Sequence, residues 1–140
     1  MATELPIAVG DRVLVVRGDL AGGELASALV VRGARVDDIV AYRTREAPES
    51  SRDRLREATA GGPLVAVVFS SGSTVRGLVA LGRDESIDVL SIPSVCIGPE
   101  TAQVARAAGF HVLAVSPTPD SAALAAATAR ALARLPQEIA

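Results

Sequence analysis

Short runs of apolar, mostly β-branched residues alternate with helix-forming stretches along almost the whole chain. Continuous apolar runs of this length are typical of strands that are buried on both faces of a sheet. Strict alternation of strand and helix favours parallel pairing, with right-handed crossovers. The expected strands are residues 12–16, 35–42, 64–69, 95–97 and 111–115. The expected helices are residues 22–32, 51–60, 73–81, 99–108 and 121–135. The pattern therefore predicts an α/β fold: a five-stranded parallel sheet with helices on both faces, in a flavodoxin-like arrangement.

Composition indicates one globular domain and excludes several classes of partner. The chain has 140 residues, of which 49% are hydrophobic and 21% charged, enough to bury a core. The net charge is −2 and aromatic residues make up 2%, so a nucleic acid is not expected as a partner. No apolar run approaches the length of a membrane span. The single cysteine excludes an internal disulfide and favours a cytoplasmic location.

The residue types exclude most of the chemistries that α/β folds carry. All 14 basic residues are arginines, so no lysine is present for a Schiff base or a P-loop. Gly18, Gly22 and Gly23 have the wrong spacing for a dinucleotide fingerprint. Cys96 is expected inside a buried strand, and the one histidine, His111, opens a strand at the end away from a ligand. We therefore expect neither a metal site nor a bound cofactor.

What remains is a set of hydroxyls and backbone donors where strands run into helices. A helix start offers unpaired N–H groups and a partial positive charge to an anion. The relevant residues are Ser70, Ser71, Ser73 and Thr74 at one start, Gly98, Pro99, Glu100 and Thr101 at a second, and Ser116, Thr118 and Ser121 at a third. Each of these residues taken alone also fits an ordinary helix cap. Three starts at one sheet edge favour a ligand with several negative groups.

Two further side chains are predicted to belong to this site. Tyr42, the only tyrosine, ends the second strand at the same edge, and Arg17 ends the first. A guanidinium pairs well with a carboxylate. The alternative for Tyr42 is a half-exposed tyrosine that only packs at a strand end.

Several motifs, in order and spacing, resemble the uroporphyrinogen-III synthase family. The resemblance runs from Gly10 to about Leu132. Its motifs are Val13–Gly18; Leu25, Leu29, Gly33, Ala34 and Val36; Tyr42-Arg43-Thr44; Val68–Ser71 with Ser73 and Val75; and Cys96–Pro99 with Thr101, Ala102, Ala105, Gly109, Phe110 and Val112.

The resemblance implies a two-lobed enzyme of which this chain matches only the second half. Members of the family are about twice as long and carry their active site in the cleft between two α/β lobes. By that pattern residues 10–42 belong to one lobe and residues 48–135 to the other, with residues 43–47 as the crossing. Two outcomes are open. Either residues 1–140 fold as one five-stranded domain, or two chains form a homodimer by exchanging residues 10–42.

The resemblance also implies a reaction. The family converts linear hydroxymethylbilane into cyclic uroporphyrinogen III, with loss of water and inversion of the last pyrrole ring, for haem, sirohaem and cobalamin biosynthesis, and uses no cofactor. Tyr42 matches the family tyrosine that assists loss of the hydroxyl as a general acid or by orienting water. Ser70, Ser71 and Thr101 match its cleft hydroxyls, and we add Arg17, Ser73 and Gly98 as substrate-binding residues. The alternatives are a tetrapyrrole- or small-anion-binding module without turnover, and a structural flavodoxin-like domain.

Overall fold

The computed structural model describes residues 7–136, which form two compact units. One unit ends at Arg45 and the other begins at Glu46. Each unit has its own parallel sheet and its own apolar core. Within the described range, no helix combines the length and apolar character that crossing a bilayer requires.

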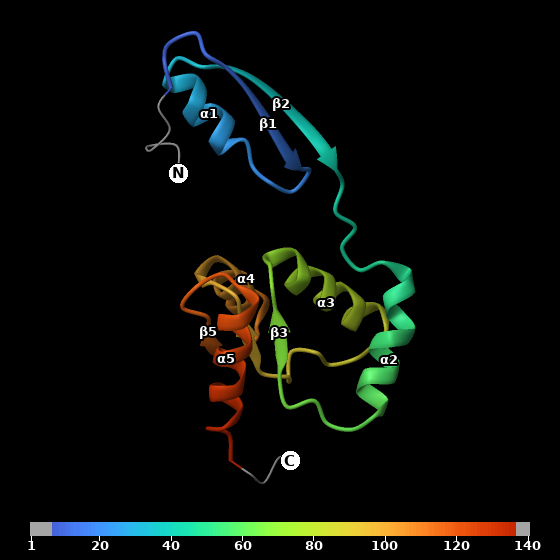
Figure 1. The fold of residues 1–140 in the computed structure, drawn as a ribbon. Helices are drawn as coiled ribbons and strands as arrows, with labels where there is room; N and C mark the ends of the chain where they lie inside the picture. The colour runs from blue at the N-terminus through green and yellow to red at the C-terminus, as the bar shows by residue number, and fades with distance from the viewer. Residues whose placement is uncertain (1–6, 137–140) are drawn as a thin grey trace. The chain divides into compact units, whose positions relative to one another are not determined.

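The first unit is a strand–helix–strand motif. It consists of β1 (Arg12–Gly18), α1 (Glu24–Val31) and β2 (Arg35–Tyr42), and α1 lies along the two strands (Figure 1). The strands pair in parallel, with Val13 opposite Val36. Side chains from one face of this pair bury Leu29 of α1, which is only 2% exposed.

The second face of the β1–β2 pair is exposed to solvent. Leu14 and Val16 alternate with the core residues of β1 and are 61% and 57% exposed. Ile39 lies opposite Val16 and is 47% exposed. The expectation of strands buried on both faces is therefore wrong for this unit.

The second unit contains a three-stranded sheet and four α-helices. It begins with the short 3₁₀ helix η1 (Glu49–Ser51), and its strands have the order β3-β4-β5, all parallel. The remaining elements are α2 (Arg52–Ala60), β3 (Val67–Phe69), α3 (Gly72–Asp84), β4 (Ser94–Cys96), α4 (Pro99–Ala108), β5 (Val112–Val115) and α5 (Ser121–Leu132).

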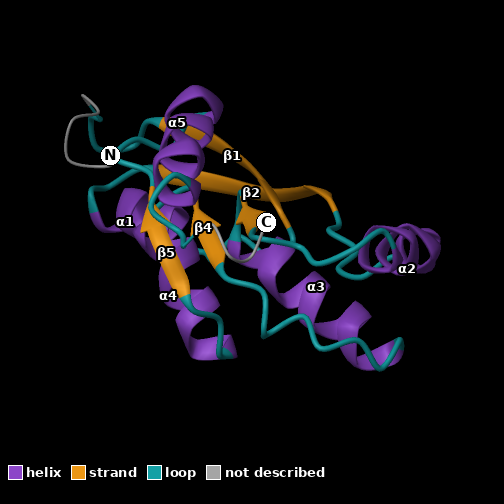
Figure 2. Cartoon of the chain, turned by 90° about the horizontal axis from the view of Figure 1, so that it is seen from below, coloured by secondary structure: helices purple, strands orange, loops and turns teal. Residues whose placement is uncertain are grey.

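Helices cover both faces of this sheet. Cys96 of β4 is fully buried in a core shared with α3 and α4, which also holds the edge-to-face pair of Phe69 and Phe110. The neighbouring Val95 points to the opposite face and packs against Leu124 of α5. Figure 2 accordingly shows α5 on one side of β4 and β5, and α3 and α4 on the other.

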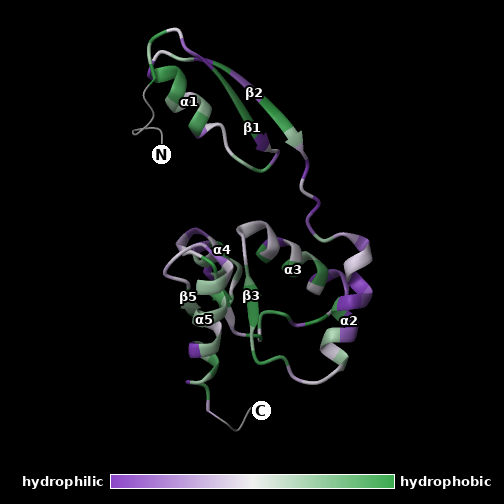
Figure 3. Ribbon diagram, viewed as in Figure 1, coloured by the Kyte–Doolittle hydropathy of each residue, from purple (hydrophilic) through white to green (hydrophobic). Residues whose placement is uncertain are grey.

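Ion pairs attach α2, the most hydrophilic helix of this unit, to the end of α3 (Figure 3). Arg52 pairs with Asp84 at 2.9 Å, and Arg56 donates to the carboxylate of Glu85. The side chain of Glu85 is only 6% exposed. These ion pairs act together with Leu55, which packs against the core of the unit, to hold the helix.

Residues 7–136 contain the five parallel strands and five α-helices of the prediction, but within this range the strands form two sheets rather than a single five-stranded one. Alternation of strand and helix fixes the direction in which strands pair, but not which strands are neighbours. Residues 43–48, between β2 and η1, contain no helix or strand. The segment between β2 and β3 does include a helix, α2, yet β2 pairs with β1 and β3 pairs with β4, in separate sheets.

Several element boundaries also differ from the prediction, and two of these differences have a clear cause. The third strand is shorter than residues 64–69, because its partner β4 has only three residues. The third helix does not stop before Gly82 but runs on to Asp84. A Cβ atom at position 82 would lie 2.8 Å from Val89, so this glycine serves close packing inside the helix.

Candidate functional site: helix starts at a sheet edge

Three helix starts lie at one edge of the sheet in the second unit. The strands β3, β4 and β5 are neighbours and parallel, so their carboxyl ends share an edge. The chain runs from these ends into α3, α4 and α5. In open parallel sheets, ligands bind at this edge. The three starts differ in how their N–H groups are used.

The start of α3 is capped by its own hydroxyls. The N-cap Ser71 accepts a hydrogen bond from the Thr74 N–H at 3.3 Å, and Thr74 accepts one from the Ser71 N–H. The hydroxyls of Ser71 and Ser73 are 2.9 Å apart. Ser70, one residue earlier, is exposed. The hydroxyls of two predicted substrate-binding residues, Ser71 and Ser73, are thus already hydrogen-bonded at the helix start, as expected if they only cap the helix.

The start of α5 is capped by a carboxylate. Asp120 accepts from the Ala123 N–H at 2.8 Å and from the Thr118 hydroxyl at 2.6 Å. These hydrogen bonds, that of Thr118 first, lower the pKa of Asp120 from its ordinary value of 3.8. Ser116 is buried and donates its hydroxyl to the Thr118 carbonyl. A negative charge at this start makes it a poor place for a second anion.

Of the three starts, only that of α4 has no side-chain cap. Its N-cap is Gly98, and Pro99 occupies the first turn. A Cβ atom on Gly98 would meet no other heavy atom within 4 Å, so the space above this start is open. Thr101, in the first turn, is only 6% exposed. This start is therefore the one at this edge best suited to receive an anion on backbone N–H groups.

Tyr42 and Arg17 both lie at the carboxyl end of the strands in the first unit. Tyr42 is 65% exposed. The Arg17 Nε atom donates to the carboxylate of Asp38 at 2.9 Å, and its Nη1 atom donates to the carbonyl of Ala21 at 2.7 Å. Arg17 therefore braces its own strand end. Its contact with a substrate carboxylate stays a prediction.

The five predicted residues of the second unit share one sheet edge. They are Ser70, Ser71, Ser73, Gly98 and Thr101. The other two predicted residues, Tyr42 and Arg17, belong to the first unit.

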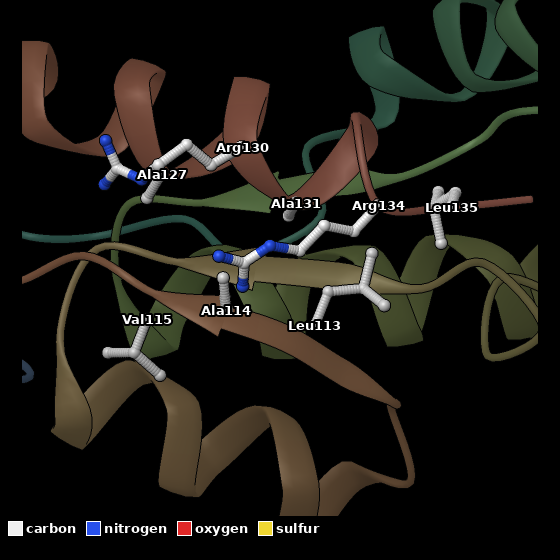
Figure 4. A pocket seen from close by; sticks show the side chains of 8 residues that line it. All are labelled: Leu113, Ala114, Val115, Ala127, Arg130, Ala131, Arg134 and Leu135. Atoms are coloured by element: carbon white, nitrogen blue, oxygen red, sulfur yellow. The ribbon is translucent and has the colours of Figure 1, made fainter.

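Sequence reasoning missed a hollow beside β5. It has a volume of about 260 Å³, and none of the predicted site residues lines it. Two arginine side chains of the last helix and its end, Arg130 and Arg134, border its apolar floor (Figure 4). Their spacing of four residues places them on one helix face. That spacing is the only signal the sequence carried. The full lining is Leu113, Ala114, Val115, Ala127, Arg130, Ala131, Arg134 and Leu135.

Solved structures of known proteins resemble this fold. One, described as Thermus thermophilus uroporphyrinogen III synthase, is 24% identical, with a TM-score of 0.52 over 91% of this chain and 53% of that chain. A second structure, a wild-type, native crystal form of the synthase from the same bacterium, has the same identity and a TM-score of 0.56, over 91% of this chain and 52% of that chain. At this identity the likeness shows the fold.

Sequence comparison gives the family. A curated relative, the porphyrin biosynthesis protein HemD of Ruminiclostridium josui, is 30% identical over 112 residues, which are 79% of this chain and 22% of the relative. The chain thus spans about half of the solved synthases and about a fifth of this relative. The family model described as uroporphyrinogen-III synthase HemD matches residues 1–126. The chain therefore belongs to the uroporphyrinogen-III synthase family.

Proposed function

We propose that the chain is a uroporphyrinogen-III synthase that closes hydroxymethylbilane to uroporphyrinogen III in cytoplasmic tetrapyrrole biosynthesis. The observation that carries the proposal is the family match over residues 1–126. That range contains Tyr42 and the uncapped start of α4.

The substrate class fits the helix starts at the sheet edge. The substrate that the family resemblance implies, hydroxymethylbilane, carries eight carboxylates. The start of α4 offers N–H groups without a side-chain cap, and the nearby Ser70 is exposed. Backbone donors at a helix start hold a carboxylate without the cost of ordering a long side chain. We therefore assign substrate binding first to Gly98 and Thr101, and then to Ser70, Ser71 and Ser73.

Tyr42 is the proposed catalytic residue. Its phenol donates a proton to the leaving hydroxyl, so that the carbon–oxygen bond breaks and water departs. The exposure of Tyr42, at 65%, leaves the ring open to an incoming substrate. Arg17, at the same strand end, provides a cation for one of the carboxylates. Holding the flexible substrate in a coil then favours ring closure by proximity.

We further propose that two chains assemble by exchanging residues 10–42, so that residues 48–135 of one copy meet residues 10–42 of the other. The exposed apolar face of β1 and β2 supports this assembly, since such a face favours a covering partner. The solved synthases, about twice as long as this chain, support it too. Light scattering after size exclusion tests it, because a clean monomer mass excludes the exchanged dimer.

The activity is tested with freshly made hydroxymethylbilane. The purified chain is incubated with this substrate, and the uroporphyrin I and III isomers are separated after oxidation. Isomer III above the control without protein supports the synthase. Isomer I alone, which forms spontaneously, supports the second candidate, a non-catalytic tetrapyrrole- or anion-binding module. The half-length match to the solved synthases is the observation that favours this second candidate.

A further inference from the structure

Gly18 and Tyr42 are in direct contact at the ends of β1 and β2. The two residues lie opposite each other in the parallel strand pair, because the register of the pair shifts between Arg17 and Gly18. A Cβ atom on Gly18 would lie 2.8 Å from the Cε2 and Cζ atoms of Tyr42 and 2.9 Å from its hydroxyl oxygen. Non-bonded carbon atoms prefer separations of about 3.5–4.0 Å. Any side chain at position 18 would therefore push the phenol out of its place.

Asp19 holds the main chain at Tyr42 and just after it. Its N–H donates to the carbonyl of Tyr42 at 3.1 Å, and its Oδ1 atom accepts from the N–H of Thr44 at 2.8 Å. The tyrosine backbone is thus tied at its own carbonyl and again two residues later. The Asp19 carboxylate is the only side-chain group in these two links.

The turn that carries Gly18 and Asp19 is itself anchored. The Ala21 N–H donates to the Gly18 carbonyl at 3.2 Å, and Arg17 donates to the Ala21 carbonyl at 2.7 Å. Arg17 is held in turn by Asp38. The two residues that contact Tyr42 therefore sit on a braced turn rather than on a free loop.

We propose that Gly18 and Asp19 are positioning residues that hold the Tyr42 phenol in its reactive orientation. The inference rests on the proposed catalytic role of Tyr42. A ring that is 65% exposed is not fixed by burial, and an exposed side chain exchanges among rotamers. The contact with Gly18 restricts the ring instead, and the two hydrogen bonds of Asp19 fix the main chain that carries it. Misplacing a reacting group by about 1 Å costs on the order of 10²-fold in rate.

The test uses the fact that Tyr42 is the only tyrosine and that the chain has no tryptophan. In a protein labelled at tyrosine, the ring resonances therefore report on this one side chain. The wild type is expected to show a nuclear Overhauser effect between the ring Hε protons and the Hα protons of Gly18. Asp19→Ala is expected to weaken this effect and to lower kcat about 10- to 100-fold, with KM within about twofold.

Conservative and matched variants separate positioning from folding. Asp19→Asn keeps the Oδ1 acceptor, so it is expected to restore both the Overhauser effect and kcat. Gly18→Ala is expected to shift the ring resonances and to lower kcat. Gly23→Ala, in the same unit, places its Cβ in open space and is expected to change neither. The amide spectrum of α1 verifies that each variant is folded.

The outcomes are distinguishable from those for the proposed function. An unchanged Overhauser effect and kcat in Asp19→Ala overturn the inference, and so does a wild-type spectrum without the effect. If the wild type makes no isomer III, the synthase proposal fails, and the Overhauser effect in the Asp19 variants still decides the positioning. If Tyr42→Phe has the wild-type rate, Tyr42 has no catalytic role, and the Overhauser effect in the Asp19 variants still decides whether Asp19 positions the ring.

Discussion

Gly82 and Val89 pack so closely that a Cβ atom on the glycine would lie 2.8 Å from Cγ2 of the valine. Gly82 lies inside α3, and Val89 is buried in the core beneath it. We expect Gly82→Ala to lower the free energy of unfolding by about 1–3 kcal/mol through overpacking. The higher helix propensity of alanine offsets at most about 1 kcal/mol of this loss. Urea unfolding, followed by circular dichroism, measures the difference.

A double-mutant cycle shows whether the contact itself is responsible. Val89→Ala removes the two methyl groups that crowd position 82, so the two substitutions together should cost less than the sum of their separate costs. Gly61→Ala is the control, because its Cβ would make an ordinary contact of 3.6 Å with Glu57. Additive effects of Gly82→Ala and Val89→Ala would show that the steric explanation is wrong.

The cap of α5 should make stability depend on pH in the acidic range. Hydrogen bonds from Thr118 and Ala123 lower the pKa of Asp120 below 3.8, so the unfolded chain binds the proton more tightly than the folded protein does. The stabilisation is therefore fully present above the unfolded pKa and is lost as the pH falls through the folded pKa. Asp120→Ala should lower Tm at neutral pH, and this difference should shrink on acidification.

Asp120→Asn is the matched variant for this experiment. Asparagine caps a helix about as well as aspartate but does not titrate in this range. Its Tm should therefore stay close to that of the wild type at neutral pH, and its loss of stability in acid should be smaller. A difference between Asp120→Ala and wild type that stays constant down to strongly acidic pH would argue against a titrating cap.

The parts of the fold that depend on local chemistry could be predicted from the sequence. The helix expected over residues 99–108 is present as α4, with Pro99 in its first turn and Gly109 after its last residue at the left-handed φ of 102° that favours glycine. The arrangement of strands could not be predicted in the same way. Which strands become neighbours depends on contacts between distant segments, and the link from β2 to η1 carries no pattern that fixes them.

In the candidate site, too, the features set by local chemistry could be predicted, and those set by tertiary packing could not. That hydroxyls gather at helix starts is visible in the sequence, but which start is left without a cap is not. Ser71 and Asp120 both turn back to cap their own helices, while Gly98 has no side chain with which to do so. The contact of Tyr42 with Gly18 depends on a register shift between two strands. Such a shift follows from tertiary packing and leaves no mark in the residue pattern.

Tyr42→Phe should separate catalysis from binding. The substitution removes only the phenolic oxygen and keeps the ring against Gly18. If the phenol acts as a general acid, kcat should fall by about 10²-fold, while the Kd for uroporphyrin III changes little. Initial rates of isomer III formation and fluorescence titration with uroporphyrin III measure the two quantities. Equal rates for the two proteins would remove Tyr42 from the mechanism.

The start of α4 can be blocked without disturbing its backbone. Gly98 has a φ of −170°, an extended conformation that any residue adopts, and its Cβ position is free of other heavy atoms within 4 Å. A side chain there would stand over the N–H groups at the helix start. Since a charge at a helix terminus is worth about 0.3–1 kcal/mol, Gly98→Val should weaken uroporphyrin III binding about two- to fivefold.

Gly23→Ala serves as the control for this blocked helix start. Gly23 is the N-cap of α1, also lacks a side-chain cap, and has equal space for a Cβ atom. If the anion binds at α4, only the variant at Gly98 should lose affinity, and its loss should diminish as salt screens the charges. Chemical denaturation of both variants separates a loss of binding from a loss of folding. Equal affinity of the wild type and Gly98→Val would place the carboxylates elsewhere, because a valine over the start of α4 cannot coexist with an anion held there.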